Sequence, residues 1–120
     1  MYDVTIIGKG PAGISASLYT KRAGLNTLII GKDGGALEGA EKIENYYGLD
    51  KALTGKELIL RGIRQAEELN IEIITDEVVD IKNENCYKIL TRKNTYESKT
   101  LILATGSNRK TPKISRTNRI

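Results

Sequence analysis

The 120-residue chain contains no histidine, tryptophan or phenylalanine, and it has one cysteine and two prolines. The lack of histidine excludes imidazole catalysis and a histidine-ligated zinc. The single Cys86 excludes an intrachain disulfide and a Cys-x-x-Cys dithiol, so we expect a reducing compartment, the cytoplasm. The first apolar run, Val4–Ile7, is too short for a signal peptide, and no run could cross a bilayer, so we expect no membrane partner.

Neither sign of charge dominates most of the chain, since 19 basic and 15 acidic residues give a formal net charge of only +4. The charges are spread out, which favours solubility over nucleic-acid binding. The exception is the end of the chain, Asn108–Ile120, which has five basic residues and no acid. No aromatic residue interleaves these charges, so the pattern predicts a domain over residues 1–112 and a solvated or disordered basic tail over 113–120.

The first thirty residues have the pattern of a β-α-β unit. Val4–Ile7 is apolar, β-branched and followed by glycine, as in a buried parallel strand. Pro11 suits the first turn of a helix that continues to Ala23, and Gly24 suits its carboxyl end. A second strand is expected over 26–30. The two strands should be parallel and joined by a right-handed connection.

The remainder predicts one more helix and several strands. Thr54 and Glu57 form a capping box that begins a helix ending near Asn70. A third strand follows at 71–74. The hydrophobic period then changes to two over 78–81, 87–91 and 95–98, and a fully apolar strand follows at 100–104. This order predicts an α/β fold, a Rossmann-like three-layer domain with a parallel sheet and an antiparallel β-meander.

Gly8, Gly10 and Gly13 have the G-x-G-x-x-G spacing, between a strand and a helix. The first glycine permits the tight turn, the second leaves room for a pyrophosphate, and the third lets the helix lie close to the strands. This context indicates a dinucleotide site. The acid that usually holds the ribose at the end of the second strand is replaced by Gly31 and Lys32. We therefore expect backbone and loop contacts to hold the adenosine end.

Three segments together resemble one family. The family is that of thioredoxin reductases and related pyridine nucleotide-disulfide oxidoreductases, whose amino-terminal FAD motif resembles "IIGKGPAGISASLYTKRAGL". The family's G-G-Q-L…E-N-x-P-G segment resembles "GGALEGAEKIENYYG", and its second FAD motif resembles "TLILATGS". The order and spacing of the segments also match. The resemblance covers the chain up to about Pro112.

The resemblance implies FAD as the cofactor and implies its contacts. Residues 8 and 10–13 would face the pyrophosphate, and 31–32 would flank the adenosine. Residues 35–37 would line the path to the flavin, 45 would bond the ribityl chain or flavin, 78 would meet the adenine edge through its backbone, and 104–106 would close over the cofactor. The implied site residues are Gly8, Gly10, Pro11, Ala12, Gly13, Gly31, Lys32, Gly35, Ala36, Leu37, Asn45, Val78, Ala104, Thr105 and Gly106. Ala36 replaces the family's glutamine, and Tyr47 replaces its proline.

The resemblance also implies what these residues do not supply. Full members add a nicotinamide domain with a redox dithiol and a returning glycine-aspartate segment near the flavin. The sequence has neither, so we expect no catalytic residue and no metal site. It is interpreted as the FAD-binding portion of such an oxidoreductase, with a homodimer or a partner chain covering its apolar surface. Two alternatives stay open: a stand-alone nucleotide-binding module without redox turnover, and an interaction protein for which the fold is a scaffold.

Overall fold

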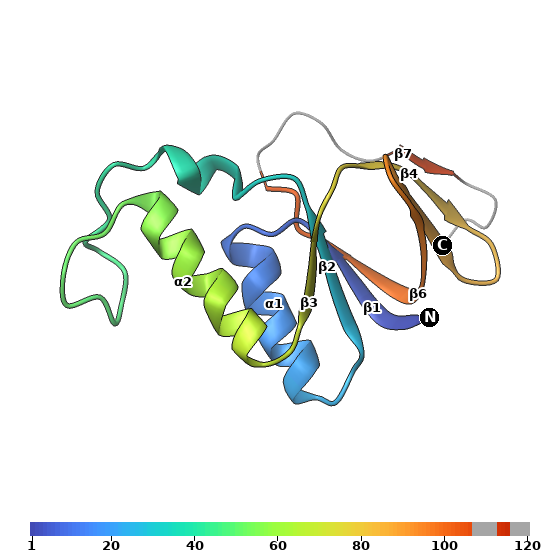
Figure 1. The fold of residues 1–120 in the computed structure, drawn as a ribbon, viewed down its shortest axis with the longest axis horizontal. Helices are drawn as coiled ribbons and strands as arrows, with labels where there is room; N and C mark the ends of the chain where they lie inside the picture. The colour runs from blue at the N-terminus through green and yellow to red at the C-terminus, as the bar shows by residue number, and fades with distance from the viewer. Residues whose placement is uncertain (107–112, 116–120) are drawn as a thin grey trace.

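The computed structural model describes residues 1–106 and 113–115, which form two α-helices, one 3-10 helix and seven strands (Figure 1). In chain order the elements are β1 (Tyr2–Ile7), α1 (Pro11–Arg22), β2 (Thr27–Gly31), η1 (Gly35–Gly39), α2 (Gly55–Glu68), β3 (Glu72–Thr75), β4 (Val78–Asn83), β5 (Tyr87–Thr91), β6 (Thr95–Leu103) and β7 (Lys113–Ser115).

The described strands form one sheet in the order β3-β2-β1-β6-β5-β4-β7. Strands β3, β2, β1 and β6 are parallel, whereas β6, β5 and β4 run antiparallel as a meander. Figure 1 shows α1 and α2 on one side of the parallel strands and the meander on the other side. The architecture is the α/β, Rossmann-like arrangement that the sequence predicts, with helices, parallel strands and meander as its three layers.

Each face of the parallel strands buries its own apolar cluster. The cluster toward the helices contains Val4, Ile6, Ile14, Ile29, Ala66 and Ile71. The cluster toward the meander contains Ile7, Leu28, Ile30, Ile81 and Ile89. Strand β2 is buried along its whole length, because it has layers on both of its faces. Two-sided burial explains why the buried parts of β1 and β2 are mainly β-branched and aliphatic residues.

The local helix signals agree with the structure. Helix α1 begins at Pro11 and ends next to Gly24, whose φ of +84° reverses the chain after the helix. At the start of α2, the Thr54 hydroxyl accepts the amide of Glu57 at 3.1 Å, and the Glu57 carboxylate accepts the amide of Thr54 at 2.8 Å. The predicted capping box is confirmed.

Strand β6 differs from the prediction of two strands at 95–98 and 100–104. It is one strand in which Ser98 lies opposite Tyr87 of β5 on one side and opposite Tyr2 of β1 on the other. No glycine or proline interrupts the chain between the two predicted strands, so the backbone continues from the meander into the parallel sheet. One strand therefore joins two layers.

The tail also differs from its prediction at three residues. Lys113–Ser115 form β7, which pairs in parallel with β4 and sets Ile114 opposite Ile81. The edge of β4 offers free backbone donors and acceptors, which a passing extended segment can satisfy. The other residues of the predicted tail, 116–120, and the predicted boundary at 112 lie outside the described residues.

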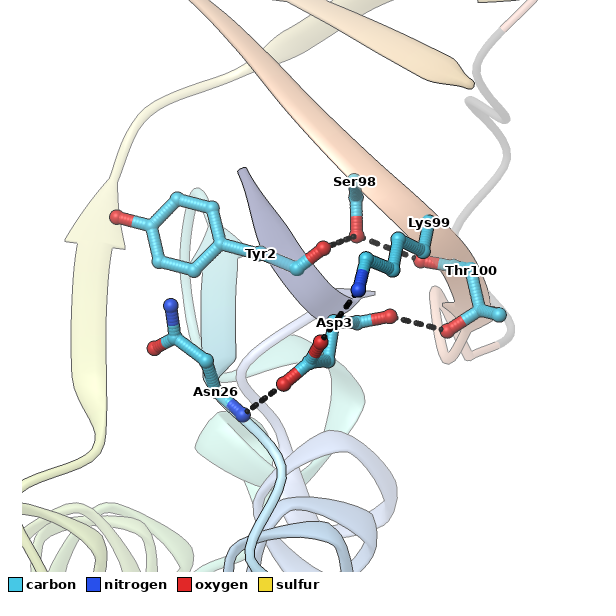
Figure 2. A network of polar contacts seen from close by, with 6 residues as sticks. All are labelled: Tyr2, Asp3, Asn26, Ser98, Lys99 and Thr100. Carbon is cyan, nitrogen blue, oxygen red and sulfur yellow. Dashed lines mark hydrogen bonds and ion pairs between the residues drawn. The ribbon is translucent and has the colours of Figure 1, made fainter. Parts of the chain in front are cut away.

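A polar network joins β1, β2 and β6 at the amino-terminal end of the parallel strands (Figure 2). The Asn26 amide donates to the Asp3 carboxylate at 2.7 Å, and Lys99 forms an ion pair with the same carboxylate at 3.4 Å. The Thr100 hydroxyl donates to the Asp3 carbonyl at 2.7 Å, and Ser98 donates to the Thr100 carbonyl at 2.8 Å. Asp3 therefore holds two neighbouring strands with its side chain and backbone.

Asp3 is expected to make folding sensitive to acid. The Asn26 amide, and after it Lys99, lower the pKa of Asp3 from 3.8. Because the folded pKa is the lower one, the carboxylate stabilises the fold fully above about pH 4 and loses this effect as the pH falls through the folded pKa. Asp3→Asn should flatten the fall of the unfolding free energy below pH 4, measured by urea denaturation from pH 6 to 2.5. Exposed Asp50→Asn is the control, and equal slopes in both variants would contradict the role of Asp3.

Candidate functional site

A cleft of about 860 Å³ opens at the carboxyl ends of β1 and β2 and reaches the start of α1. Its other walls come from the segment around η1, the β3–β4 junction, the turn after β5 and the end of β6. In open α/β sheets, ligands bind outside the carboxyl ends of the strands, at the point where the strand order reverses. Here β1 has β2, the next strand along the chain, on one side and β6 on the other. The volume lies in the range of small-molecule and cofactor sites.

The start of α1 presents backbone amides to this cleft. Pro11 occupies the first turn, and the first helical hydrogen bond runs from the Ile14 amide to the Gly10 carbonyl at 3.0 Å. Among the described residues, no side chain caps this helix, and its first turn has no acid. Pro11 and Ala12 line the cleft and are exposed. This end of the helix is suited to an anion, through its free amides and the helix dipole.

The motif glycines are required by close backbone approaches. Gly8 has a φ of +120°, and a Cβ there would lie 2.1 Å from the Ala104 carbonyl oxygen. A Cβ on Gly13 would lie 1.9 Å from the Gly8 carbonyl oxygen, which confirms that this glycine lets α1 lie close to β1. A Cβ on Gly10 would lie 2.9 Å from the Gly34 carbonyl oxygen. Gly10 therefore makes room for the loop after β2.

The structure brings thirteen of the fifteen predicted site residues to the lining of this one cleft: Gly8, Gly10, Pro11, Ala12, Gly31, Lys32, Gly35, Ala36, Leu37, Val78, Ala104, Thr105 and Gly106. Gly13 lies behind the lining, inside α1. Asn45 belongs to the loop between η1 and α2, which protrudes beyond α2 in Figure 1, and it does not line the cleft.

The missing acid after β2 has a steric explanation. A Cβ on Gly31 would lie 2.5 Å from Cγ of Lys9 and 2.7 Å from its backbone nitrogen. Lys9 is itself fixed, because its ammonium donates to the Thr75 hydroxyl at 2.9 Å. Position 31 therefore has no space for a carboxylate side chain, and the adjacent Lys32 is exposed.

The structure adds a carboxylate from the neighbouring strand that the sequence reasoning missed. Asp76 follows β3 and lines the cleft, and its amide donates to the Gly31 carbonyl at 3.1 Å. Its side chain is buried, and its carboxylate accepts the Glu77 amide at 2.7 Å. The Thr91 hydroxyl, and after it the Glu77 amide, lower the pKa of Asp76. Asp76 is thus an ionised group that holds the β3–β4 junction in place.

Glu77, Val79 and Arg92 also line the cleft and were missed. Arg92 lies outside the motif segments, in the turn after β5, and lines the cleft where its side chain bonds Glu77. The sequence signal that could have identified Glu77 and Val79 is their position after β3, since the residues that follow a parallel strand lie at the ligand-binding edge of the sheet.

Other kinds of site find no support in the described residues. That part of the chain contains no group of three or more acidic or cysteine side chains that could hold a metal ion. Within the same residues, no helix is long and apolar enough to span a membrane. Cys86 lies in the turn between β4 and β5 and is not part of the cleft lining.

A parallel sheet, a glycine turn with close backbone approaches and an uncapped helix at the cleft define the class of dinucleotide-binding α/β domains. A family model for pyridine nucleotide-disulphide oxidoreductases matches residues 2–119. The chain therefore belongs to this family, and it corresponds to the amino-terminal, FAD-binding region of thioredoxin reductases.

Individual relatives agree with this assignment. The thioredoxin reductase of Ureaplasma parvum is 39% identical over 110 residues, which cover 89% of this chain and 35% of that protein. The solved thioredoxin reductase of Lactococcus lactis is 35% identical with a TM-score of 0.84 and covers 92% of this chain and 37% of its own. The atypical thioredoxin reductase of Desulfovibrio vulgaris Hildenborough is 39% identical with a TM-score of 0.84, and the match covers 97% of this chain and 40% of that one. The chain thus spans about a third of the length of its curated relatives.

Proposed function

We propose that this chain binds FAD in the cleft and is the FAD-binding part of a thioredoxin reductase-like flavoprotein oxidoreductase. The observation that carries the proposal is the meeting of all three motif segments around one cleft at the uncapped start of α1. A glycine turn that served packing alone would not need the η1 segment and the end of β6 to converge on the same cavity.

The residues of the cleft fit the parts of FAD. The amides at the start of α1 would hold the pyrophosphate, since they are free of side-chain caps and the dipole favours an anion. Gly35 and Gly106 have a φ of +76° and +70°, with open space where a Cβ would point, so a flat group can approach their backbone. When bound, the flavin supplies hydride and electron transfer. The chain's own contribution is to position it, and Cys86 is not among the residues that line the cleft.

Ala12→Glu tests the pyrophosphate position. A carboxylate in the first turn of α1 is favourable to the helix dipole, so we expect unchanged or slightly higher thermal stability. The same charge faces the cleft and repels a diphosphate, so FAD affinity should fall about tenfold or more. FAD binding is measured by quenching of flavin fluorescence on titration.

Ser15→Glu is the matched control, because it adds the same charge to an exposed position of the same helix outside the cleft lining. It should leave the affinity unchanged. If the wild-type chain fails to bind FAD, the proposed function is wrong. If both variants bind like wild type, the pyrophosphate does not lie at α1.

We also propose a cytoplasmic location and a homodimer or a partner chain, with no nucleic-acid partner. The single cysteine supports a reducing compartment. Fully exposed Tyr47 and the exposed neighbouring Tyr46 give the loop before α2 an apolar aromatic surface that suits a protein contact. Light scattering of the purified chain measures the oligomeric mass.

A further inference from the structure

One end of the cleft combines Gly31 and Val78, which the resemblance assigns to the adenosine, with side chains that no motif assigns. It lies next to Gly31, where the Asp76 amide binds the end of β2, and continues along the β3–β4 junction. Position 31 has no room for the acid that usually holds the ribose, so the other side chains of this wall are the candidates for recognising what binds at this end. Besides Asp76 and Val78, this wall contains Val79 and the Glu77–Arg92 pair.

Val79 enters the wall through an irregularity in β4. Val78 lies opposite Thr91 and Asp80 lies opposite Leu90, so Val79 is an extra residue in the antiparallel ladder. Such a bulge re-aims side chains, whereas in a regular strand adjacent side chains point to opposite faces. Val78 and Val79 both line the cleft, and Val79 is 46% exposed despite being apolar. The bulge thus places bare apolar surface inside the cleft.

Arg92 is fixed beside this surface by two bonds to one residue. Its amide donates to the Glu77 carbonyl at 3.1 Å, and its Nε donates to the Glu77 carboxylate at 2.7 Å. The side chain of Glu77 is largely covered and that of Arg92 is 66% exposed, so the pair is anchored on its acidic side. A hydrogen bond to Nε lies in the plane of the guanidinium and leaves both of its faces available for stacking.

We propose that Arg92, oriented by Glu77, and the bulged Val79 recognise the adenine ring of the cofactor by stacking. A planar cation and an apolar side chain suit the two faces of a purine. A phosphate is disfavoured at this place because Asp76 and Glu77 put two carboxylates beside the single guanidinium. This inference rests on the proposed function, since it assigns the adenosine end of the same cleft.

The test uses FAD, ADP and FMN as separate probes, titrated into the 120-residue chain by calorimetry. Arg92→Ala should weaken ADP and FAD about tenfold and leave FMN, which has no adenine, unchanged. Arg92→Lys keeps the charge but loses the planar group, so it should weaken ADP nearly as much. Lys93→Ala is the control, because this exposed residue of the same turn carries the same charge outside the cleft lining.

The outcomes separate the two proposals. Failure of the wild-type chain to bind both FAD and ADP overturns the proposed function. If the wild-type chain binds FAD, and Arg92→Ala binds ADP as tightly as wild type does, the role of Arg92 is overturned and the proposed function still stands. Full recovery in Arg92→Lys shows that charge and not stacking recognises the ligand, which also overturns the inference. Thermal denaturation of each variant checks that the fold is retained.

Discussion

Gly13→Ala is expected to lower the free energy of unfolding by about 2 kcal/mol, whereas Gly62→Ala is expected to raise it by about 1 kcal/mol. Both glycines lie inside α-helices, α1 and α2, where alanine has the better intrinsic propensity. The opposite signs follow from the surroundings of the added methyl group.

At Gly13 the new Cβ would lie 1.9 Å from the backbone oxygen of Gly8, and backbone cannot yield by a rotamer change. Relief requires α1 to move away from β1, which opens the cluster that contains Ile6 and Ile14. At Gly62 the nearest atom is Cγ2 of Ile14 at 3.5 Å, an ordinary contact, so the helix gains propensity without overlap.

Urea denaturation of both variants, followed by circular dichroism, gives the two free energies. Stabilisation by both substitutions would mean that α1 lies farther from β1 than the structure places it. Destabilisation by both would mean that the surface of α2 next to Ile14 is more crowded than a 3.5 Å contact implies.

The parts of the fold that depend on local signals could be predicted from the sequence. The β-α-β unit is defined by two apolar runs, Pro11 and Gly24, and α2 by its capping box, all within a few residues of the structure they specify. Ten of the thirteen site residues in the cleft belong to the three motif segments, and they converge because these segments follow strands whose carboxyl ends meet at one edge. Asn45 shows the limit, because its placement depends on the path of the long loop between η1 and α2.

The parts that depend on distant pairing could not be predicted. Arg92 lines the cleft where it bonds Glu77, fifteen residues earlier, and β7 pairs with the edge of β4. Likewise the contact of Gly55 with the Leu37 carbonyl oxygen, where a Cβ would come within 1.7 Å, fixes η1 on α2 with no local signal. Composition and hydrophobic periodicity report on residues that are close in the sequence, and they do not identify the residues that meet from different layers of the fold.

Gly8→Ala is expected to lower the free energy of unfolding by about 4 kcal/mol, more than Gly13→Ala does. Two costs combine at this position. A φ of +120° is accessible almost only to glycine, and the new Cβ would lie 2.1 Å from the Ala104 carbonyl oxygen. Gly24→Ala isolates the first cost, because Gly24 has a φ of +84° and nothing within 4 Å of the added carbon. Its loss should be about 1 kcal/mol.

The same substitution should also weaken FAD binding, since Ala104–Gly106 form one wall of the cleft and the overlap pushes them away from β1. The backbone bond from the Ala104 amide to the Ile7 carbonyl, 2.8 Å long, would stretch or break with that shift. The expected pattern is therefore a joint loss of stability and affinity in Gly8→Ala, and a small loss of stability with unchanged affinity in Gly24→Ala. Urea denaturation and FAD titration at 10 °C measure both. Equal stability of the two variants would show that backbone conformation alone, and not the junction of β1 with β6, makes Gly8 necessary.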